Sequence, residues 1–408
     1  MARSQRIKLK YIAKVQMGQS PPSADYTNEA DGIPFLQGTA EFGDKYPVAK
    51  IFSSNPSKIC NVGDILFSVR AQVGDINISN NQYGIGRGLC AIRGNSNATN
   101  DFLWWALHHE RNQLKFVETG TTYSAVAAED VGNLLISVFS EDEKIRINEF
   151  LNKQIAQIDN LISSKSKLLI HLSEKRQAFI TQAVTKGIIP KVKMKKSGVD
   201  WLGDMPAHWE LTKMKYLGEI FYGLSQPPVY KDEGTPLIRA TNVYRGKIIK
   251  EGLVFVDENE IQSAKKIKLS FGDIIIVRSG AYTADSAIVT EQWEGSIAGF
   301  DMVLKPNKRV LPELLATILL SSYVLEYQLM PLRIRAAQPH LNSEELGGVF
   351  VLLPSIDEQK KINQYLKIEL EKIELIINAT KKSIQLLNER RLSIITAAVT
   401  GLIEIPTS

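Results

Sequence analysis

The chain has 408 residues, of which 44% are hydrophobic and 23% are charged, and its formal net charge is +5. This length accommodates two domains, and the hydrophobic fraction is ordinary for a globular protein. No apolar run approaches the ~18 residues of a membrane-spanning helix, and the basic N-terminus lacks the apolar core of a signal peptide. Cys60 and Cys90 are too few for a disulfide or metal framework, so we expect buried thiols in a reducing compartment.

Residues 1–140 are predicted to form a mixed, strand-rich domain. A helix is expected to begin after the cap-like Asn100, and Trp104 and Trp105 on it are expected to pack in a core or interface rather than to stack on bases. Short apolar runs separated by Gly, Asn, Ser and Pro indicate strands joined by turns, as at residues 34–36, 64–67 and 88–92.

Residues 141–187 and 356–402 are predicted to form two long spacer helices that repeat one sequence. Residues 142–185 align without a gap with residues 357–400 at an offset of 357 − 142 = 215, and 16 of these 44 positions are identical. Such a long internal repeat indicates duplication rather than a solenoid. In both copies apolar residues recur at steps of three, four and seven, which indicates a seam on one helical face.

Each predicted helix would be on the order of 65 Å long, at about 1.5 Å per residue. Gly187 and Gly401 stand where a C-terminal stop is expected. A lone helix with so narrow a seam is unstable, so we expect the two copies to pair as an antiparallel intramolecular coiled coil. The alternative is that each helix packs on its own globular domain.

Residues 188–198 are interpreted as a basic linker whose lysines are solvated, with phosphate contact as the alternative. Residues 199–355 are predicted to be a second domain that repeats the first more loosely, and residues 403–408 are a C-terminal tail. Matched segments of the two domains are separated by 205, 202 and 209 residues in turn. The changing separation indicates insertions and deletions in the segments that connect them. The landmarks pair residues 10–12 with 215–217, 34–36 with 236–238, and 63–66 with 272–275.

The predicted fold class is therefore α+β, with two similar strand-rich domains, two long antiparallel helices and a pseudo-two-fold tandem repeat. Sequence motifs of catalysis are absent: there is no phosphate-binding P-loop and no dinucleotide-binding glycine motif. The Asn/Asp-Pro-Pro-aromatic turn that amino-methylating enzymes need is also absent. His108 and His109 are adjacent on a predicted helix and make a poor metal pair. The chain is predicted to be a non-catalytic reader.

Two stretches of the sequence resemble a known family. The repeated helix ends in Ile-Thr-x-Ala-Val-Thr, and residues 197–210 read SGVDWLGDMPAHWE. Both are similar to the specificity subunits of type I restriction–modification systems, and the resemblance covers essentially the whole chain. The first half departs from this pattern, because it lacks the Trp-Leu-Gly and His-Trp stretch and starts directly at the framework of residues 8–10.

The resemblance implies that each globular domain reads one half of a bipartite DNA site and that the helix pair fixes the gap between the halves. Two modification subunits would dock and methylate adenines with S-adenosylmethionine. Restriction subunits would add translocation and cleavage driven by ATP and Mg²⁺. This chain itself would bind no cofactor or metal. It would be a cytoplasmic, prokaryotic protein that meets the nucleoid when it binds DNA.

Two alternatives remain at this stage. The first is a stand-alone, sequence-specific DNA-binding regulator with the same architecture. The second is a structural coiled-coil spacer whose domains bind proteins. Copurification with a subunit that binds S-adenosylmethionine would separate the leading hypothesis from both, and salt-sensitive binding to duplex DNA would separate the regulator from the spacer.

Reading of DNA requires polar side chains on loops that reach base edges and phosphates. For any single residue the alternative is a solvated or structural turn. In the first domain we expect the readers to be Gln19, Ser20, Gln37, Thr39, Arg70, Gln72, Arg87, Thr121, Thr122 and Tyr123. In the second domain we expect them to be Ser225, Gln226, Arg239, Thr241, Asn242, Arg278, Tyr282, Arg335, Gln338 and His340.

Docking of partner subunits is expected near the repeated ends of the two long helices. The alternative is that the same residues are buried within the coiled coil. The candidates are Phe179, Ile180, Thr181, Val184, Ile394, Ile395, Thr396 and Val399.

Overall fold

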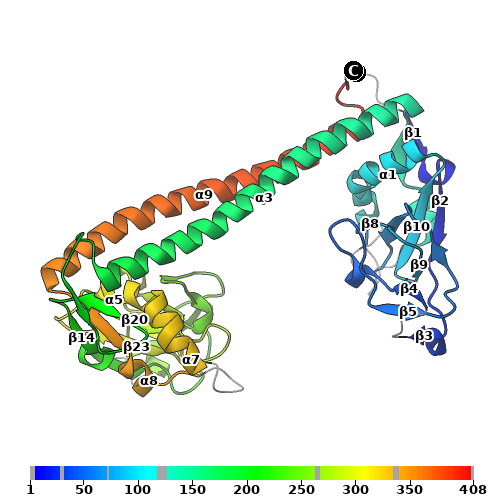
Figure 1. Ribbon diagram of the computed structural model, residues 1–408. Coiled ribbons are helices and arrows are strands. Elements are labelled where there is room, and N and C mark those ends of the chain that lie inside the picture. The colour runs from blue at the N-terminus through cyan, green and yellow to red at the C-terminus, as the bar shows by residue number, and fades with distance from the viewer. Residues whose placement is uncertain are drawn as a thin grey trace. The chain divides into compact units, whose positions relative to one another are not determined.

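The computed structural model describes residues 5–27, 32–70, 73–116, 126–261, 267–333 and 340–405. The chain divides into two compact units. Unit 1 consists of Met1–Ser166 together with Lys381–Ser408, and unit 2 consists of Lys167–Thr380. Unit 1 is therefore discontinuous in sequence, because the last part of the chain returns to it (Figure 1).

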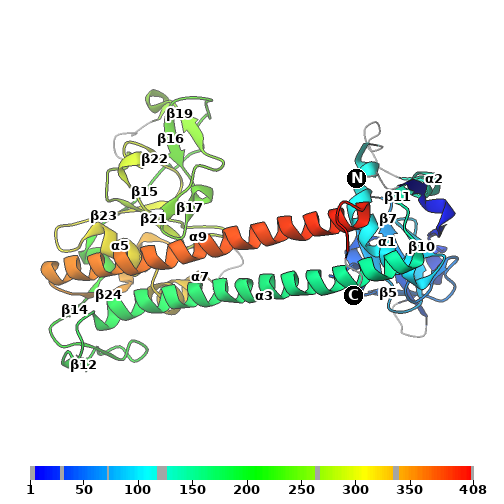
Figure 2. The same cartoon turned by 90° about the horizontal axis from the view of Figure 1, so that it is seen from above.

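Two long helices, α3 (Glu141–Lys186) and α9 (Ile356–Thr400), each contribute one part to unit 1 and one part to unit 2. In unit 1, Ile158 from the first part of α3 shares an apolar cluster with Ile395 from the last part of α9. In unit 2 the last part of α3 shares a cluster with the first part of α9. Figures 1 and 2 show these parts side by side in each unit, so the predicted antiparallel intramolecular pair is confirmed.

Both long helices stop at a glycine, as the sequence predicts. Gly187 has a φ of 77° and Gly401 a φ of 74°, a left-handed conformation that other residues rarely adopt. After Gly401, the amide of Leu402 donates to the carbonyl oxygen of Ala397 at 2.9 Å, which satisfies one of the open carbonyls of the last turn.

Unit 1 contains a four-stranded antiparallel sheet in the order β2-β10-β7-β8, a five-stranded sheet in the order β3-β5-β4-β9-β6, and the pair β1-β11. Its helices are α1 (Asn97–Glu110) and α2 (Ala128–Gly132). The strands are β1 (Arg6–Lys8), β2 (Ala13–Met17), β3 (Tyr26–Thr27), β4 (Ile33–Leu36), β5 (Ile51–Ser53), β6 (Ile59–Cys60), β7 (Ile65–Ser68), β8 (Ile76–Ile78), β9 (Tyr83–Ile85), β10 (Leu89–Gly94) and β11 (Leu135–Ser137).

Unit 2 contains a four-stranded antiparallel sheet in the order β15-β23-β20-β21, a three-stranded sheet in the order β19-β16-β22, and the pairs β12-β13, β14-β24 and β17-β18. Its shorter helices are α5 (Pro312–Leu319), α6 (Ser322–Val324), α7 (Met330–Arg333) and α8 (Ser343–Gly348). The strands are β12 (Met194–Lys196), β13 (Asp204–Pro206), β14 (Glu210–Lys213), β15 (Gly218–Tyr222), β16 (Thr235–Ile238), β17 (Val243–Tyr244), β18 (Lys247–Ile248), β19 (Val254–Val256), β20 (Ile274–Ile276), β21 (Ser286–Ile288), β22 (Ile297–Ala298), β23 (Met302–Pro306) and β24 (Phe350–Leu353).

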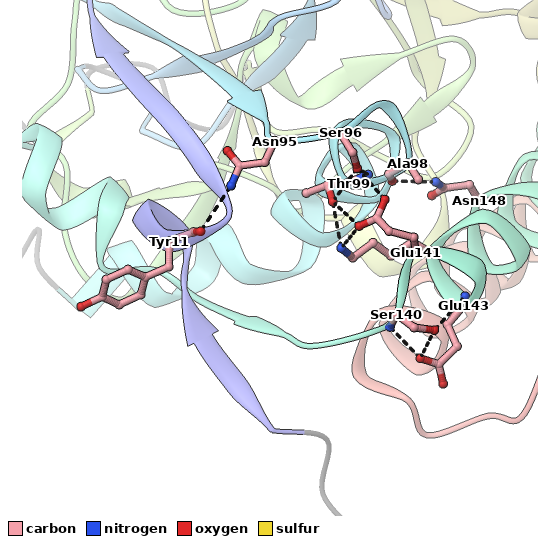
Figure 3. Close-up of polar contacts among 10 residues, drawn as sticks. Tyr11, Asn95, Ser96, Ala98, Thr99, Ser140, Glu141, Glu143 and Asn148 are labelled. Atoms are coloured by element: carbon pink, nitrogen blue, oxygen red, sulfur yellow. Dashed lines mark hydrogen bonds and ion pairs between the residues drawn. The ribbon is translucent and has the colours of Figure 1, made fainter.

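The two units repeat one fold, which confirms the predicted duplication. The four-stranded sheets have corresponding strand orders, and each unit has one parallel pair, β4 with β9 and β16 with β22. Small details repeat as well. The side-chain amide of Asn95 donates to the carbonyl oxygen of Tyr11 at 3.3 Å, and that of Asn307 donates to the carbonyl oxygen of Tyr216 at 3.0 Å (Figure 3 shows the first pair).

The central strands β7 and β20 have apolar clusters on both faces. Ile65 and Phe67 join one cluster, while Leu66 between them joins another. Ile274 and Ile275 divide in the same way. Because successive side chains of a strand point to opposite faces, each four-stranded sheet is covered on both sides, and its central strand is a continuous apolar run.

Polar contacts fix the start of α3 to α1 (Figure 3). Glu141 accepts from the hydroxyl of Ser96 at 2.6 Å and from Lys144 Nζ at 2.7 Å, and these bonds lower the pKa of Glu141 to about 2. The side-chain amide of Asn148 donates to the carbonyl oxygen of Ala98 at 3.1 Å. In unit 2 Gln359, which corresponds to Lys144, accepts from the amide of Leu311 just before α5 at 2.8 Å.

One local prediction needs correction, and the structure adds detail to another. Helix α1 begins at Asn97 rather than after Asn100, because Ser96 caps it by accepting from the amide of Thr99 at 3.0 Å. The region predicted as a solvated linker contains β12, which pairs with β13, and Lys195 Nζ donates to the carbonyl oxygen of Trp209 at 2.9 Å. The linker therefore includes part of a hairpin, while its lysines Lys191, Lys193, Lys195 and Lys196 are exposed, as predicted.

Other local predictions are confirmed. Trp105 is buried and Trp104 packs against the same core. Cys60 and Cys90 are buried free thiols, and burial raises the pKa of Cys90 to about 12. Among the described residues no single helix is long and apolar enough to cross a membrane, although one bent pair, Pro312–Leu319 with Ser322–Leu332, passes that test jointly by length and composition.

Candidate nucleic-acid interface

In unit 1 the ends of four strands and the start of a fifth meet at one edge. β4 and β9 are parallel, with Leu36 opposite Ile85, so both strands end at this edge. β2 and β7 are antiparallel to β10, so their last residues lie opposite its start. Strand register therefore gathers loops from four separate parts of the sequence.

The corresponding edge of unit 2 is built in the same way. β16 and β22 are parallel, and β15 and β20 run antiparallel to β23. In both units a glycine allows the chains to cross closely. A Cβ on Gly18 would lie 2.2 Å from the Gly86 carbonyl oxygen, and one on Gly223 would lie 2.0 Å from that of Gly299. Only glycine fits such an approach without displacing the backbone.

Nine of the fourteen predicted reading residues that the structure describes follow directly or closely on these strand ends. Gln19 and Ser20 follow β2, Gln37 follows β4, Arg70 closely follows β7, and Arg87 lies between β9 and β10. Side chains that are distant in the sequence are thus brought to one edge. In unit 2 the same places hold Ser225 and Gln226 after β15, Arg239 after β16, and Arg278 after β20.

Most of the predicted reading residues have side chains that are exposed enough to contact a large ligand. The exposed side chains are Gln19, Gln37, Arg70, Arg87, Ser225, Gln226, Thr241, Tyr282 and His340, and the half-buried ones are Ser20, Thr39, Arg239 and Arg278. Gln72, Thr121, Thr122, Tyr123, Arg335 and Gln338 lie outside the described residues.

Asn242 is an exception, because the structure gives it a different role. Its side chain is fully buried, and its amide donates to the carbonyl oxygens of Ile249 and Glu251. Its side-chain oxygen accepts from the amide of Arg239. The polar atoms that would read a base already hold the loop together, so Asn242 is a structural residue.

The arginines of the two edges differ in how they are held. In unit 1, Arg87 Nε lies 3.4 Å from the hydroxyl oxygen of Ser20. In unit 2, the guanidinium of Arg278 lies 4.9 Å from the ring centre of Tyr222, and that of Arg239 lies 5.4 Å from the ring centre of Tyr230. Stacking on an aromatic face restricts an arginine before it meets a ligand.

One buried carboxyl group adjoins the unit 2 edge. Asp301 is 3% exposed and accepts from the amide of Arg278 at 3.2 Å. Burial raises the pKa of Asp301 to about 6, although the amide and the charge of Arg278 oppose this rise. The group therefore changes charge under mildly acidic conditions, directly beneath a predicted reading residue.

Sequence reasoning predicted Tyr282 but missed three other aromatic residues near the unit 2 edge. Phe300 occupies the turn between β22 and β23, where unit 1 has Arg87, and it is 41% exposed. Tyr222 and Tyr230 support the arginines described above. The glycine landmarks could have found Phe300, since it directly follows Gly299 as Arg87 follows Gly86.

Comparisons with known proteins agree with this geometry. Residues 2–170 match the family model described as the type I restriction modification DNA specificity domain. A putative type I restriction enzyme MjaX specificity subunit from Methanocaldococcus jannaschii is 37% identical over 155 residues, which cover 38% of this chain and only 36% of that relative. The type I restriction enzyme EcoBI specificity subunit from Escherichia coli is 23% identical over 372 residues, covering 88% of this chain and 77% of that relative.

The fold is also similar to that of a chain solved in a study of complex assembly and conformational transition of the type I R-M system. The TM-score is 0.77 at 18% identity, with 99% of each chain covered. Residues 2–170 thus contain a type I restriction modification DNA specificity domain. The resemblance stated from the sequence is confirmed.

Four of the eight predicted docking residues are buried in the structure. Ile180, Val184, Ile395 and Val399 are each at most 2% exposed, and the last three belong to the apolar clusters of the two units. Their burial agrees with the alternative interpretation, in which these residues are buried within the coiled coil because they lie on the inward-facing side of each helix.

The other four docking candidates, Phe179, Thr181, Ile394 and Thr396, are half-buried. Thr181 Oγ1 accepts from the amide of Ser322 at 3.1 Å, and Thr396 Oγ1 lies 3.0 Å from His109 Nδ1. Both threonines therefore fix a helix to its own unit. Among the described residues no cluster of three or more His, Cys, Asp or Glu could hold a metal ion.

Proposed function

We propose that this chain reads DNA sequence for a type I restriction–modification complex, and that each unit reads one half of a bipartite site. The observation that carries the proposal is the repeated edge: one scaffold presents Arg87 and Arg70 in unit 1 but Phe300 and Arg278 in unit 2. A common scaffold with different loop side chains is suited to two different half-sites.

The helix pair α3–α9 sets the gap between the half-sites in this proposal. A straight helical pair resists bending and compression, so it fixes a spacing in a way that a flexible linker does not. The exposed parts of the pair offer docking positions for two modification subunits, which in turn recruit restriction subunits.

In this proposal the partner subunits carry out the catalysis. S-adenosylmethionine, ATP and Mg²⁺ would bind to partner subunits, and this chain would supply recognition without catalysis. The task fits a cytoplasmic protein that meets the nucleoid when it binds DNA. Adenine methylation requires a flipped base, and the reading edges would position the duplex for that step.

The test is a map of methylated adenines produced by the chain together with its modification subunits. The proposal expects one bipartite motif with a fixed gap. Replacing residues 199–355 with the matching domain of another family member should change one half of the motif and leave the other half and the gap unchanged. An uninterrupted motif, or a change in both halves, would contradict separate reading by two units.

A further inference from the structure

Phe300 is an exposed apolar side chain at a polar edge of unit 2. It occupies the turn between β22 and β23 and is 41% exposed. Ser225 and Gln226, which follow β15, are exposed at the same edge, and Arg278 closely follows β20. A single exposed phenylalanine is ordinary on a protein surface. What distinguishes Phe300 is its position among the predicted reading residues.

The ring of Phe300 is not part of the described core of unit 2. It belongs to none of the apolar clusters of that unit, and none of the described aromatic rings packs on it. The neighbouring Tyr222 differs, because the guanidinium of Arg278 lies over its ring and its hydroxyl oxygen accepts from the amide of Ser343 at 2.9 Å. The ring of Phe300 is therefore available to a ligand.

Hydrogen bonds on both sides of Phe300 fix its turn. The carbonyl oxygen of Gly299 accepts from the amide of Leu224 at 2.8 Å. On the other side, the buried carboxylate of Asp301 accepts from the amide of Arg278 at 3.2 Å. The backbone that carries the ring is thus held before any ligand binds, so presenting the ring costs little conformational entropy.

The corresponding turn of unit 1 carries a hydrogen-bonding side chain on the same framework. Gly86 and Gly299 are matched, since the amide of each donates at 2.8 Å to the last residue of the neighbouring parallel strand. The next residue is Arg87 in unit 1 and Phe300 in unit 2. A guanidinium donates hydrogen bonds, whereas a phenyl ring has no such donor or acceptor. The two turns are therefore suited to different kinds of group.

The C5-methyl group of thymine is the apolar group that base edges present in the major groove. The other groups there are hydrogen-bond donors and acceptors. A phenyl ring pressed against those groups would leave them without a partner, which is unfavourable. Against a methyl group the ring buries apolar surface and displaces no hydrogen bond. An apolar side chain on a reading edge therefore selects thymine.

We propose that Phe300 reads the C5-methyl group of a thymine in the half-site of unit 2. Gln226 and Arg278 beside it would bond polar groups of neighbouring base pairs. This inference rests on the proposed function, because it requires unit 2 to bind a half-site, and it adds the chemical group that this unit recognises. Unit 1, with Arg87 at the matched place, makes no such contact.

The test replaces each thymine in the half-site of unit 2 by deoxyuridine, which lacks only the methyl group. The exchange of residues 199–355 described above shows which half belongs to unit 2. The full chain with its modification subunits would be titrated with duplexes that carry the mapped motif. One replacement should weaken binding about 3- to 5-fold, the scale for one methyl-sized apolar group leaving a buried contact. In the Phe300→Ala chain the same replacement should cause no loss.

Variants at a second phenylalanine and at Phe300 itself supply the controls. Phe271 is 52% exposed and precedes β20, at the opposite end of that strand from Arg278. Phe271→Ala should therefore change neither the affinity nor the preference for thymine. Phe300→Leu keeps an apolar side chain and should retain the preference. Deoxyuridine in the half-site of unit 1 should have the same effect with and without Phe300→Ala.

The outcomes distinguish this inference from the proposed function. Absence of a bipartite motif would contradict both together. A bipartite motif whose unit 2 half tolerates deoxyuridine at every thymine would overturn the methyl contact alone. Equal weakening by Phe300→Ala on thymine and deoxyuridine duplexes would also overturn it, since the ring would then act as a wedge between base pairs.

Discussion

At the scale of single residues, the arginines at the candidate DNA-binding edges of the two units differ in how far neighbouring residues restrict their side chains before DNA binds. Arg239 donates to the carbonyl oxygen of Gly252 at 2.6 Å and lies over Tyr230, so its rotamer is restricted in advance. Arg87 has the longer 3.4 Å contact with Ser20, and among the described residues it forms no salt bridge. Because ordering a flexible side chain costs about 0.5–1.5 kcal/mol, unit 2 should lose less free energy on binding.

Arg87→Ala should weaken binding to the cognate site by about 1–3 kcal/mol, or about 5- to 150-fold, and relax specificity in one half-site only. The guanidinium is the group that can bond two acceptors of a guanine edge or a phosphate. Binding constants on duplexes with each half-site scrambled in turn would show this. Lys14→Ala, at the opposite end of β2, is the matched control and should keep the half-site preference. Equal loss at both half-sites would contradict the assignment.

Asp301→Asn should stabilise the protein at pH 7 by about 1–3 kcal/mol, because the folded state then no longer holds a buried charge. The pKa of Asp301 is raised on folding, so its neutral form stabilises the fold at low pH. That contribution is lost as the pH rises from the ordinary aspartate pKa through about 6. Urea unfolding between pH 4 and 7 should show a slope that the variant lacks. An unchanged slope would mean that Asp301 is not the group responsible.

At the scale of elements, helix periodicity decides what the long helices do. Apolar residues on the seam of α3 and α9 are buried or half-buried, whereas apolar residues on the other faces are exposed; Leu151 is fully buried and Leu161 is 51% exposed. The ion pair between Arg391 Nε and Asp159 Oδ1 at 3.1 Å spans the two helices in unit 1. An exposed pair of this kind adds little stability, so the apolar seam holds the helices together.

Deleting residues 163–169 and 378–384 together should shorten the gap in the recognition site by about three base pairs. Seven residues at about 1.5 Å each remove about 10 Å of helix, and DNA rises about 3.4 Å per base pair. Seven residues also return the seam to nearly the same face. Methylation mapping would measure the new gap, with deletion from one helix alone as a control that should lower stability. An unchanged gap would contradict the spacing role of the helix pair.

At the scale of the whole molecule, the discontinuous unit 1 makes the C-terminus essential for the N-terminal fold. Ile395, Ala398 and Val399 belong to the same apolar cluster as Phe102 and Leu103 of α1. Burying a large aliphatic side chain contributes about 1.5–3 kcal/mol, and a domain has only about 5–15 kcal/mol in total. The fold of unit 1 therefore depends on residues that follow the whole of unit 2 in the sequence.

A chain truncated after Thr380 should consequently lose protection of unit 1 while unit 2 remains folded. Unit 2 consists of Lys167–Thr380 and keeps all its residues in this variant. Hydrogen exchange would report each unit separately, and a chain ending at Ile405 is the control that should keep both protected. Native protection of α1 in the truncated chain would show that the last part of α9 is dispensable.

The sequence by itself determined the features that depend on local periodicity and on repetition. The seam spacing, the terminal glycines and the matched landmarks were enough to predict two long antiparallel helices and a duplicated strand-rich domain. They also indicated the loops in which Gln19, Arg87 and Arg278 lie. These signals are readable because a helical face or a turn is encoded by neighbouring residues.

Only the tertiary structure decided which distant residues meet. Strand pairing places Arg278 at the position of Val69 rather than Arg70, since Leu341 donates to the Arg278 carbonyl oxygen as Val126 donates to that of Val69. Burial makes Asn242 structural. Non-local pairing also buries Trp209 beside the ends of the two long helices in unit 2. Register and burial arise from contacts between segments far apart in the chain, and no local pattern encodes them.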